Sequence, residues 1–175
     1  MPGPVRRGGF VLTLYEHLLS LALAGLFSAW PAPRHVCASA VHPEVPGALE
    51  RLRGAGLRLA ALTNSTEEVA RAQLEHAGII GRFEQVLSAD MVRRLKPAPE
   101  PYLLAGQRLG VAVGRVRLVA AHAWDVAGAA RAGCATAFVA RPGKVLDPLV
   151  APPDVIGADL AEVADRIIAT DVGDR

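Results

Sequence analysis

The chain has few lysines, few cysteines and no block of like charges. Each of these shortages bears on the functions and partners that can be expected of it. Its 19 basic and 17 acidic residues are interspersed, so the charge pattern does not indicate a nucleic-acid surface. Cys37 and Cys134 form neither a metal-binding spacing nor a disulfide framework, which is typical of a reducing cytoplasm. The only lysines are Lys96 and Lys144. We therefore expect a cytoplasmic protein without a nucleic-acid partner, and the rarity of lysine draws attention to Lys96.

The first part of the chain is strongly apolar. A tail rich in Pro, Gly and Arg, Met1 to Gly9, precedes the apolar segment Phe10 to Trp30. This segment has some features of a signal peptide or membrane anchor. However, Glu16 and His17 near its middle favour an amphipathic or buried helix from about Leu12 to Ala29, and a membrane location is not expected. The predicted organisation is a tail, this helix and a linker over residues 1–42, a folded core over 43–170, and a tail over 171–175.

From residue 43 onward, strand and helix patterns alternate. Apolar runs too dense for a strand with one exposed face predict buried parallel strands, and segments with helical periodicity separate them. This alternation is typical of an α/β fold with helices on both faces of a parallel sheet. The predicted strands are Leu57–Leu62, Phe83–Leu87, Val116–Ala121 and Thr136–Ala140, with a short edge strand at Asp154–Gly157; the predicted helices are Glu44–Gly54, Glu67–Ala77, Pro99–Leu109, Val126–Ala132 and Leu160–Ile168.

Polar residues follow three of these strands at the point where each strand ends. Thr63 and Asn64 follow the first strand, Lys96 lies in a loop after the second, and the segment His122 to Asp125 follows the third. The carboxyl ends of parallel strands meet at one edge, where helix N-termini favour anions, so we expect these residues to converge. Asp125 has a second interpretation as a helix N-cap, worth about 1 kcal/mol.

Three phrases carry a family resemblance: LAALTNST, FEQVLSADMVRRLKPAPEPY and LVAAHAWDVAGAARAGCATAFVARPG. Their order and context resemble the haloacid dehalogenase superfamily, and more narrowly the type II (S)-2-haloacid dehalogenases. The resemblance covers about Pro43 to Gly143. It implies a Rossmann-like α/β fold and hydrolytic removal of halide from a 2-haloacid through an aspartyl ester. The expected partner is a small 2-haloacid, and a homodimer is an expected assembly.

The resemblance also implies roles for individual residues. Thr63 and Asn64 would hold the substrate carboxylate or the second oxygen of the nucleophile. Lys96 would stabilise the attacking carboxylate, and Asp125 would pair with Lys96 and orient it. Tyr102 would help to bind the substrate, although half-buried packing is its other interpretation.

The loop after the third strand separates two branches of the superfamily. Magnesium-dependent phosphatases need several carboxylates around the ion, whereas Asp125 is the only one in this loop. A metal-free dehalogenase is therefore expected, with Mg²⁺ required only in the phosphatase alternative. His122 and Trp124 are expected to shape the loop. Gly54 and Gly56 lie between a helix and a strand, the reverse of a dinucleotide-binding loop, so no such cofactor is expected.

The largest departure from the resemblance is the missing nucleophile. The family carries an aspartate on a first strand in the centre of the sheet, but no aspartate precedes Asp90 here, and Glu16, Glu44 and Glu50 lack the required context. One expectation is that the N-terminal part of the chain is truncated or diverged, and that the apolar segment is a remnant of a helical cap. Another is that the chain is a non-catalytic binding module. Either Phe10 to Leu14 fills the central strand position, or the sheet is gapped.

Overall fold

The computed structural model describes residues 10–14 and 41–173 of the chain. These residues form an α/β fold in which strands and helices alternate along the sequence. The strands are β1 (Phe10–Leu14), β2 (Arg58–Thr63), β3 (Gln85–Ser88), β4 (Val116–Ala120), β5 (Ala135–Val139) and β6 (Val155–Gly157); the helices are α1 (Val45–Gly54), α2 (Glu67–His76), α3 (Pro99–Leu109), α4 (Ala123–Arg131) and α5 (Leu160–Asp171), with short 3-10 turns at Ile80–Arg82, Ala89–Val92 and Val113–Arg115.

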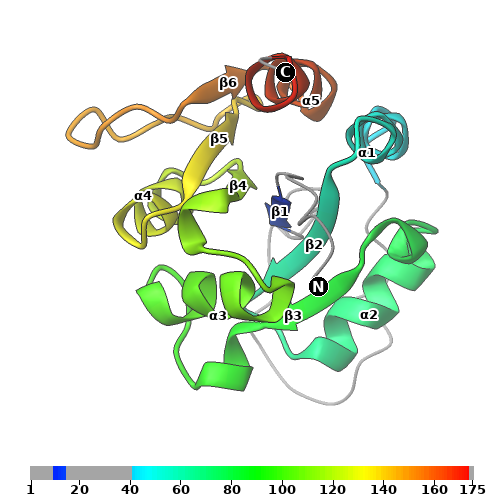
Figure 1. The fold of residues 1–175 in the computed structure, drawn as a ribbon, viewed down its shortest axis with the longest axis vertical. Helices are drawn as coiled ribbons and strands as arrows, with labels where there is room; N and C mark the ends of the chain where they lie inside the picture. Colours follow the sequence, from blue (N-terminus) through cyan, green and yellow to red (C-terminus); the bar gives the residue numbers. More distant parts are fainter. Residues whose placement is uncertain (1–9, 15–40, 174–175) are drawn as a thin grey trace, which may run out of the picture.

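The six strands form one parallel sheet in the order β3-β2-β1-β4-β5-β6. Figure 1 shows β1 in the middle, between β2 and β4. Its backbone is in register with both neighbours, since Thr13 pairs with Ala61 on one side and with Val119 on the other. The chain builds outward from β1 to β3 and then crosses to β4, so the strand order reverses beside β1. Ligand sites in open α/β sheets lie at such a switch point, outside the carboxyl ends of the strands.

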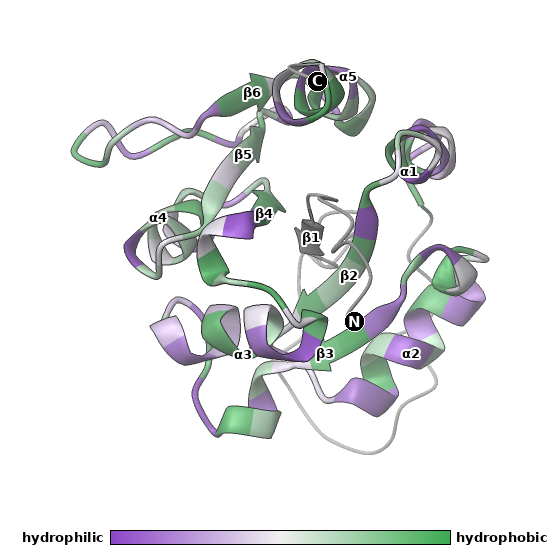
Figure 2. Cartoon of the chain, viewed as in Figure 1, coloured by the Kyte–Doolittle hydropathy of each residue, from purple (hydrophilic) through white to green (hydrophobic). Residues whose placement is uncertain are grey.

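Helices cover both faces of the sheet, each over its own apolar core. One core joins α1, α2 and α5 to the sheet through residues such as Leu49, Leu74 and Ile167. The other joins α3 and α4 to the opposite face through Tyr102 and Val126. Figure 2 shows that apolar residues (green) dominate the strands, as expected for strands buried on both faces. The predicted fold class and the predicted strands of the core are confirmed.

The sequence prediction was wrong at the start of the apolar segment. A helix was predicted from about Leu12, but Leu12 to Leu14 belong to the central strand β1. A short apolar run suits a buried strand as well as a buried helix, and here pairing with two neighbours decides between them. The alternative in which Phe10 to Leu14 fills the central position is confirmed, and the described sheet has no gap. The remaining part of the predicted helix, a cap remnant in our interpretation, lies outside the described residues.

Two helices differ from their predicted limits by more than one residue. Helix α4 begins at Ala123 instead of Val126, with His122 as its N-cap residue. Asp125 therefore lies inside the first turn, and its interpretation as an N-cap is wrong. Helix α5 continues to Asp171, three residues beyond Ile168, and Arg117 binds the Asp171 carboxylate there at 2.7 and 2.8 Å. Among the helices that the structure describes, none has the length and apolar character needed to cross a membrane.

Candidate active site

A buried ion pair lies at the carboxyl edge of the sheet. Lys96 Nζ is 3.1 Å from Asp125 Oδ2, and both side chains are 0% exposed. Lys96 also donates to the main-chain oxygen of Leu62 at 3.3 Å. Removing two charges from water is costly unless further hydrogen bonds satisfy them, and these contacts supply part of that compensation. The pair therefore has a fixed geometry next to the end of β2.

Tyr102 holds the other oxygen of the same carboxylate. Its hydroxyl donates to Asp125 Oδ1 at 2.5 Å, and the tyrosine is 0% exposed. Burial and the Asp125 charge raise the pKa of the phenol far above its usual value, so it remains a donor. Both carboxylate oxygens are thus engaged by α3 and by the loop before it. The structure gives Tyr102 an orienting contact with Asp125, and the predicted contact with substrate stays a prediction.

Gly128 on α4 makes this arrangement sterically feasible. A Cβ atom at Gly128 would lie 2.8 Å from the Tyr102 hydroxyl, 2.6 Å from Pro97 Cβ and 2.9 Å from the Pro97 carbonyl oxygen. Real Cβ atoms essentially never approach other heavy atoms so closely, so any larger residue would push α4 away from α3. Sequence analysis missed this residue. The feature of the sequence that could have indicated it is a glycine inside a predicted helix, a position where glycine normally lowers stability.

Asn64 holds the backbone of Lys96 from two sides. Its Oδ1 accepts a hydrogen bond from the Lys96 main-chain N at 2.8 Å, and its Nδ2 donates to the Lys96 main-chain O at 3.3 Å. Thr63 is fully buried beside it, and Thr63 Oγ1 accepts from the Ser65 main-chain N at 3.0 Å. Ser88 Oγ donates to the Ser65 main-chain O at 2.7 Å, which joins the ends of β2 and β3. The loop after β2 therefore fixes the loop that carries Lys96.

The structure brings together all four polar positions that the sequence singled out. Hydrogen bonds join Asn64 to Lys96 and Lys96 to Asp125 at the carboxyl edge of the sheet, and Thr63 precedes Asn64 at the end of β2. Burial and the Asp125 charge also raise the pKa of Cys134 to about 12, which keeps that thiol protonated. The catalytic roles assigned to the four residues remain predictions.

His122 and Trp124 line the outer side of this group. Their rings stack with centroids 5.6 Å apart and an interplanar angle of 20°. Lys96 Nζ lies 5.9 Å from the centroid of the Trp124 ring, within the range of a cation–π interaction. Lys144 Nζ lies 3.0 Å from His122 Nε2, so the second lysine of the chain is at the same edge. Sequence analysis missed Lys144 in this role, although the rarity of lysine was a usable signal.

The strand at the centre of the sheet contributes no carboxylate. Phe10 to Leu14 reads FVLTL, so no acidic residue lies within β1. Glu44 pairs with Arg141 at 2.5 Å, and Glu50 pairs with Arg82 at 3.0 Å, so both have other partners. Within the described residues, no group of three or more His, Cys, Asp and Glu side chains is arranged to hold a metal ion. Asp125 is the carboxylate that the described residues bring to Lys96.

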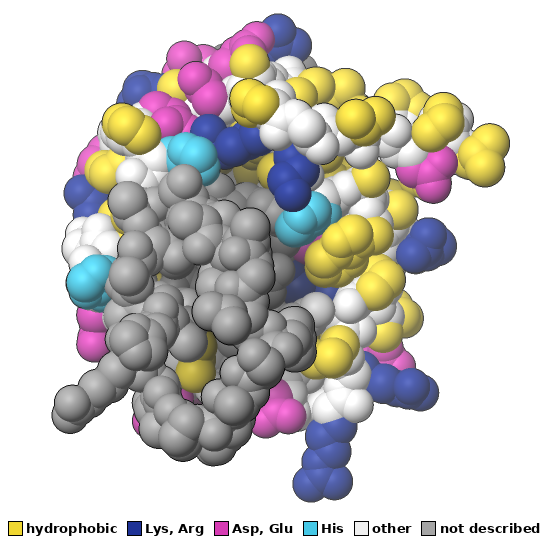
Figure 3. All heavy atoms as spheres, turned by 180° about the vertical axis from the view of Figure 1, so that it is seen from behind, with side chains coloured by type: hydrophobic (Ala, Val, Ile, Leu, Met, Phe, Trp, Pro, Cys, Tyr) yellow, Lys and Arg dark blue, Asp and Glu magenta, His cyan; other side chains and the backbone are white. Residues whose placement is uncertain are grey.

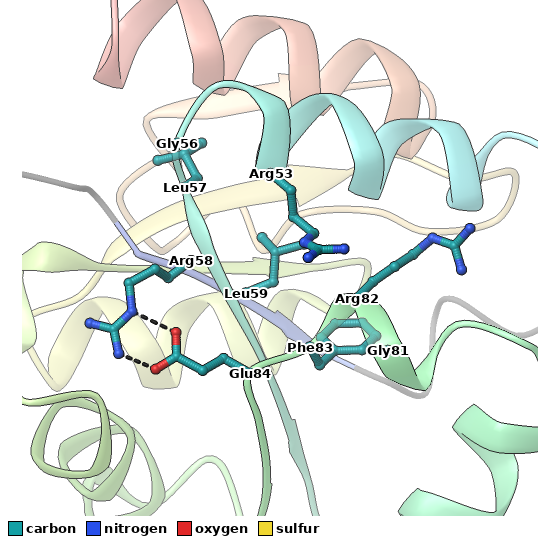
Figure 4. A pocket seen from close by; sticks show the side chains of 9 residues that line it. All are labelled: Arg53, Gly56, Leu57, Arg58, Leu59, Gly81, Arg82, Phe83 and Glu84. Atoms are coloured by element: carbon teal, nitrogen blue, oxygen red, sulfur yellow. Dashed lines mark hydrogen bonds and ion pairs between the residues drawn. The ribbon is translucent and has the colours of Figure 1, made fainter.

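A cleft of about 460 Å³ opens at the opposite edge of the sheet, where the strands begin. It is lined by Arg53, Arg58, Arg82 and Glu84 above the apolar side chains of Leu57, Leu59 and Phe83. Figure 4 shows the Arg58 guanidinium and the Glu84 carboxylate bound to each other there. This pairing engages Glu84, the one carboxylate among the lining residues that the structure describes. The candidate active site is therefore the group around Lys96.

Comparison with known proteins shows which family the chain is similar to. The sequence profile of the haloacid dehalogenase-like hydrolase family matches residues 7–133, a range that includes β1. The (S)-2-haloacid dehalogenase of Pseudomonas sp. (strain YL) is 37% identical over 111 residues, which are 63% of this chain and 48% of that protein. Probable phosphatase IndB of Dickeya dadantii (strain 3937) is 39% identical over 124 residues, 70% of this chain and 54% of that protein.

A solved structure shows the same similarity in three dimensions. The L-2-haloacid dehalogenase of Xanthobacter autotrophicus, with chloropropionic acid covalently bound, superposes with a TM-score of 0.71 at 25% identity. The superposition covers 77% of this chain and 63% of that chain. The chain spans about half the length of the curated relatives that it matches.

Proposed function

Because the chain belongs to the haloacid dehalogenase-like hydrolase family, we propose that it is a 2-haloacid dehalogenase-type domain that binds a small 2-haloacid. One observation carries this proposal: a buried Lys96–Asp125 pair, held by Tyr102 and Asn64, lies at the carboxyl edge beside the switch point of the sheet. A fixed cation in a water-poor site stabilises an anionic substrate and the charge that develops during displacement. The similarity to the Xanthobacter enzyme, which was captured with chloropropionic acid covalently bound, supports the substrate class.

We further propose that the chain as given does not complete the reaction. Displacement of halide through an ester needs a carboxylate that attacks the α-carbon, and water then hydrolyses the ester. Such a group is expected on the central strand, but β1 carries none. Thr63, Asn64 and Lys96 bind and polarise, but they cannot replace the attacking carboxylate. The loss of a covalent nucleophile commonly costs several orders of magnitude in rate.

A chimera tests both parts of this proposal. The residues before Glu44 would be replaced by the corresponding segment of the Pseudomonas sp. (strain YL) enzyme, and halide release from (S)-2-chloropropionate would be measured. We expect the chimera to release halide and its Lys96→Met variant to lose nearly all of that activity. A well-folded chimera that is inactive, or one whose activity survives Lys96→Met, would refute the assignment of the site. Arg53→Met in the chimera is a matched control, because it also replaces a basic residue by methionine but lies in the cleft at the opposite edge of the sheet.

The phosphatase alternative has one specific observation in its favour, namely the 39% identity to probable phosphatase IndB. A magnesium-dependent phosphatase needs several oxygen ligands, whereas Asp125 is the only carboxylate in the described Lys96 group, and Lys96 and Tyr102 already engage it. We therefore expect Mg²⁺ neither to raise the melting temperature nor to support hydrolysis of p-nitrophenyl phosphate. A magnesium-dependent rise in either quantity would favour the phosphatase.

We also infer a cytoplasmic location and a homodimeric assembly. The cysteine content supports the location, since a reducing compartment suits isolated thiols, and Cys134 is free and buried. Light scattering of the purified chain would test the assembly. A mass of one chain, 18.3 kDa, would contradict the homodimer.

A further inference from the structure

The two lysines of this chain lie at the same edge of the sheet, but in different environments. Lys96 is buried and paired with Asp125, so the charges of this pair cancel. Lys144 is exposed and belongs to the connection between β5 and β6. Lys96 and Asp125 shift the pKa of His122 in opposite directions, and Lys144 lowers it. Lys144 is therefore an exposed cation beside the buried pair.

A short turn positions Lys144. The Lys144 main-chain N donates to the Arg141 main-chain O at 2.9 Å, and Gly143 supplies the positive φ of 77° that this turn needs. The Arg141 side chain is bound to Glu44 at 2.5 Å, and the Arg141 main-chain N donates to Val139. The base of the turn is thus attached both to β5 and to the residue before α1. This attachment lowers the entropy lost when the lysine side chain is held in one place.

His122 holds the far end of the lysine side chain. An ammonium group can only donate, so the 3.0 Å contact requires His122 Nε2 to accept and the imidazole to be neutral. Burial and the charge of Lys144 lower the pKa of His122, which agrees with this neutral state; Lys96 acts in the same direction and Asp125 opposes it. The His122 ring stacks on Trp124, which is 39% exposed. A cation and an apolar aromatic face therefore lie side by side.

We propose that Lys144, held by His122, is the outer cation of the site, and that it recognises the carboxylate of a small organic acid whose carbon chain packs on Trp124. The proposal rests on the proposed function, since it names the group that binds the acid which Lys96 then polarises. On the face shown in Figure 3, basic and histidine side chains lie beside apolar ones, the combination that a small organic acid requires. Among the described residues, His122 is the hydrogen-bond partner of the Lys144 ammonium, which has three N–H donors in all.

Propionate is a suitable probe because it has the carboxylate and a short apolar chain but no halide to displace. Propionamide has nearly the same shape without the charge. Protein labelled with ¹³C-lysine has only two lysine side chains to observe, so their Cε signals report each site separately. We expect propionate to shift the Lys144 signal in a saturable manner, and propionamide to leave both signals unchanged.

Two variants make the test specific. Lys144→Met keeps the length of the side chain and removes the charge, and it should weaken propionate binding roughly tenfold, as expected for loss of one charge-assisted hydrogen bond. Lys144→Arg keeps the charge and should retain most of the affinity. Lys144→Met should also raise the pKa of His122, followed by its ring signals, because a cation and its hydrogen bond are lost. A structural role in the turn alone would not produce this combination.

The outcomes separate the two proposals. If the unmodified chain binds propionate and Lys144→Met binds it equally well, the role of Lys144 is wrong and the proposed function stands. If the unmodified chain does not bind propionate in preference to propionamide, the site does not recognise carboxylates, and both proposals fail. Binding that falls in Lys144→Met and returns in Lys144→Arg supports the assignment.

Discussion

Asn64 binds the main chain of Lys96 on both sides, with its Oδ1 accepting from Lys96 N at 2.8 Å and its Nδ2 donating to Lys96 O at 3.3 Å. The loop after β2 thereby fixes the loop after β3. The role proposed for the Lys96 ammonium requires that it be held within a fraction of an ångström, and a side-chain amide with both a donor and an acceptor is suited to this task. Asn64 is in this respect a positioning residue, whatever contact it also makes with a substrate.

Asn64→Ala should destabilise the protein by about 1–3 kcal/mol, because it leaves two main-chain groups of Lys96 without these partners. Asn64→Asp is the intermediate case, since it keeps the acceptor for the Lys96 main-chain N but puts a carboxylate oxygen in place of the donor to the Lys96 main-chain O. Urea unfolding should therefore rank the wild type above Asn64→Asp, and Asn64→Asp above Asn64→Ala. Equal stability of all three proteins would show that the contact does not hold the loop.

The buried Lys96–Asp125 pair should behave as a unit. Removing one partner leaves a buried charge without its counterion, which typically costs about 3–5 kcal/mol, so Lys96→Met and Asp125→Asn should each be strongly destabilising. The double variant should be far less destabilised than the sum of the single changes. A double-mutant cycle from denaturant unfolding measures this coupling. Additive effects would contradict the pairing seen here.

Gly128→Ala should disturb the contact between α3 and α4, since the new Cβ would lie 2.6 Å from Pro97 Cβ and 2.8 Å from the Tyr102 hydroxyl. We expect a loss of about 1–3 kcal/mol, the usual range for overpacking. Gly47→Ala is the control, because Gly47 lies within α1 and its Cβ would meet only Arg51 Nη1 at 3.8 Å. There alanine should be neutral or stabilising by up to about 1 kcal/mol. Thermal unfolding that affected both variants equally would argue against the proposed packing.

The stability of the protein should depend on His122 between pH 7.5 and 5.5. Burial, aided by Lys144, lowers the pKa of His122 below its ordinary value of 6.5. As the pH falls, His122 therefore binds a proton in the unfolded chain before it does so in the folded protein. The stability that comes from keeping His122 neutral is complete above about pH 6.5 and is lost as the pH falls toward the folded-state pKa. Burial also lowers the pKa of His42. His42 is present in both the wild type and a His122 variant, so its contribution cancels when the two proteins are compared.

His122→Gln isolates this contribution. The difference in unfolding free energy between the wild type and His122→Gln should shrink as the pH falls from 7.5 to 5.5. A difference that stays constant over this interval would mean that His122 titrates normally in the folded protein.

The sequence predicted the core strands, the parallel sheet and the group of polar residues, because dense apolar runs followed by polar loops leave few alternatives. It failed at Leu12 to Leu14, since a short apolar run fits a strand or a helix and only pairing with β2 and β4 decides. It also placed the start of α4 three residues late, because Ala123 and Trp124 carry no capping signal. Gly128 and Lys144 were missed since their importance depends on contacts with residues distant in sequence.

The most direct test of the account is halide release from (S)-2-chloropropionate by the purified 175-residue chain. We predict release no faster than in buffer alone or in a Lys96→Met control, because the central strand provides no carboxylate to attack the α-carbon. Turnover comparable to that of the Pseudomonas sp. (strain YL) enzyme would contradict this prediction. It would mean that another carboxylate is the nucleophile, and Asp125→Asn and Glu16→Gln would then identify which one.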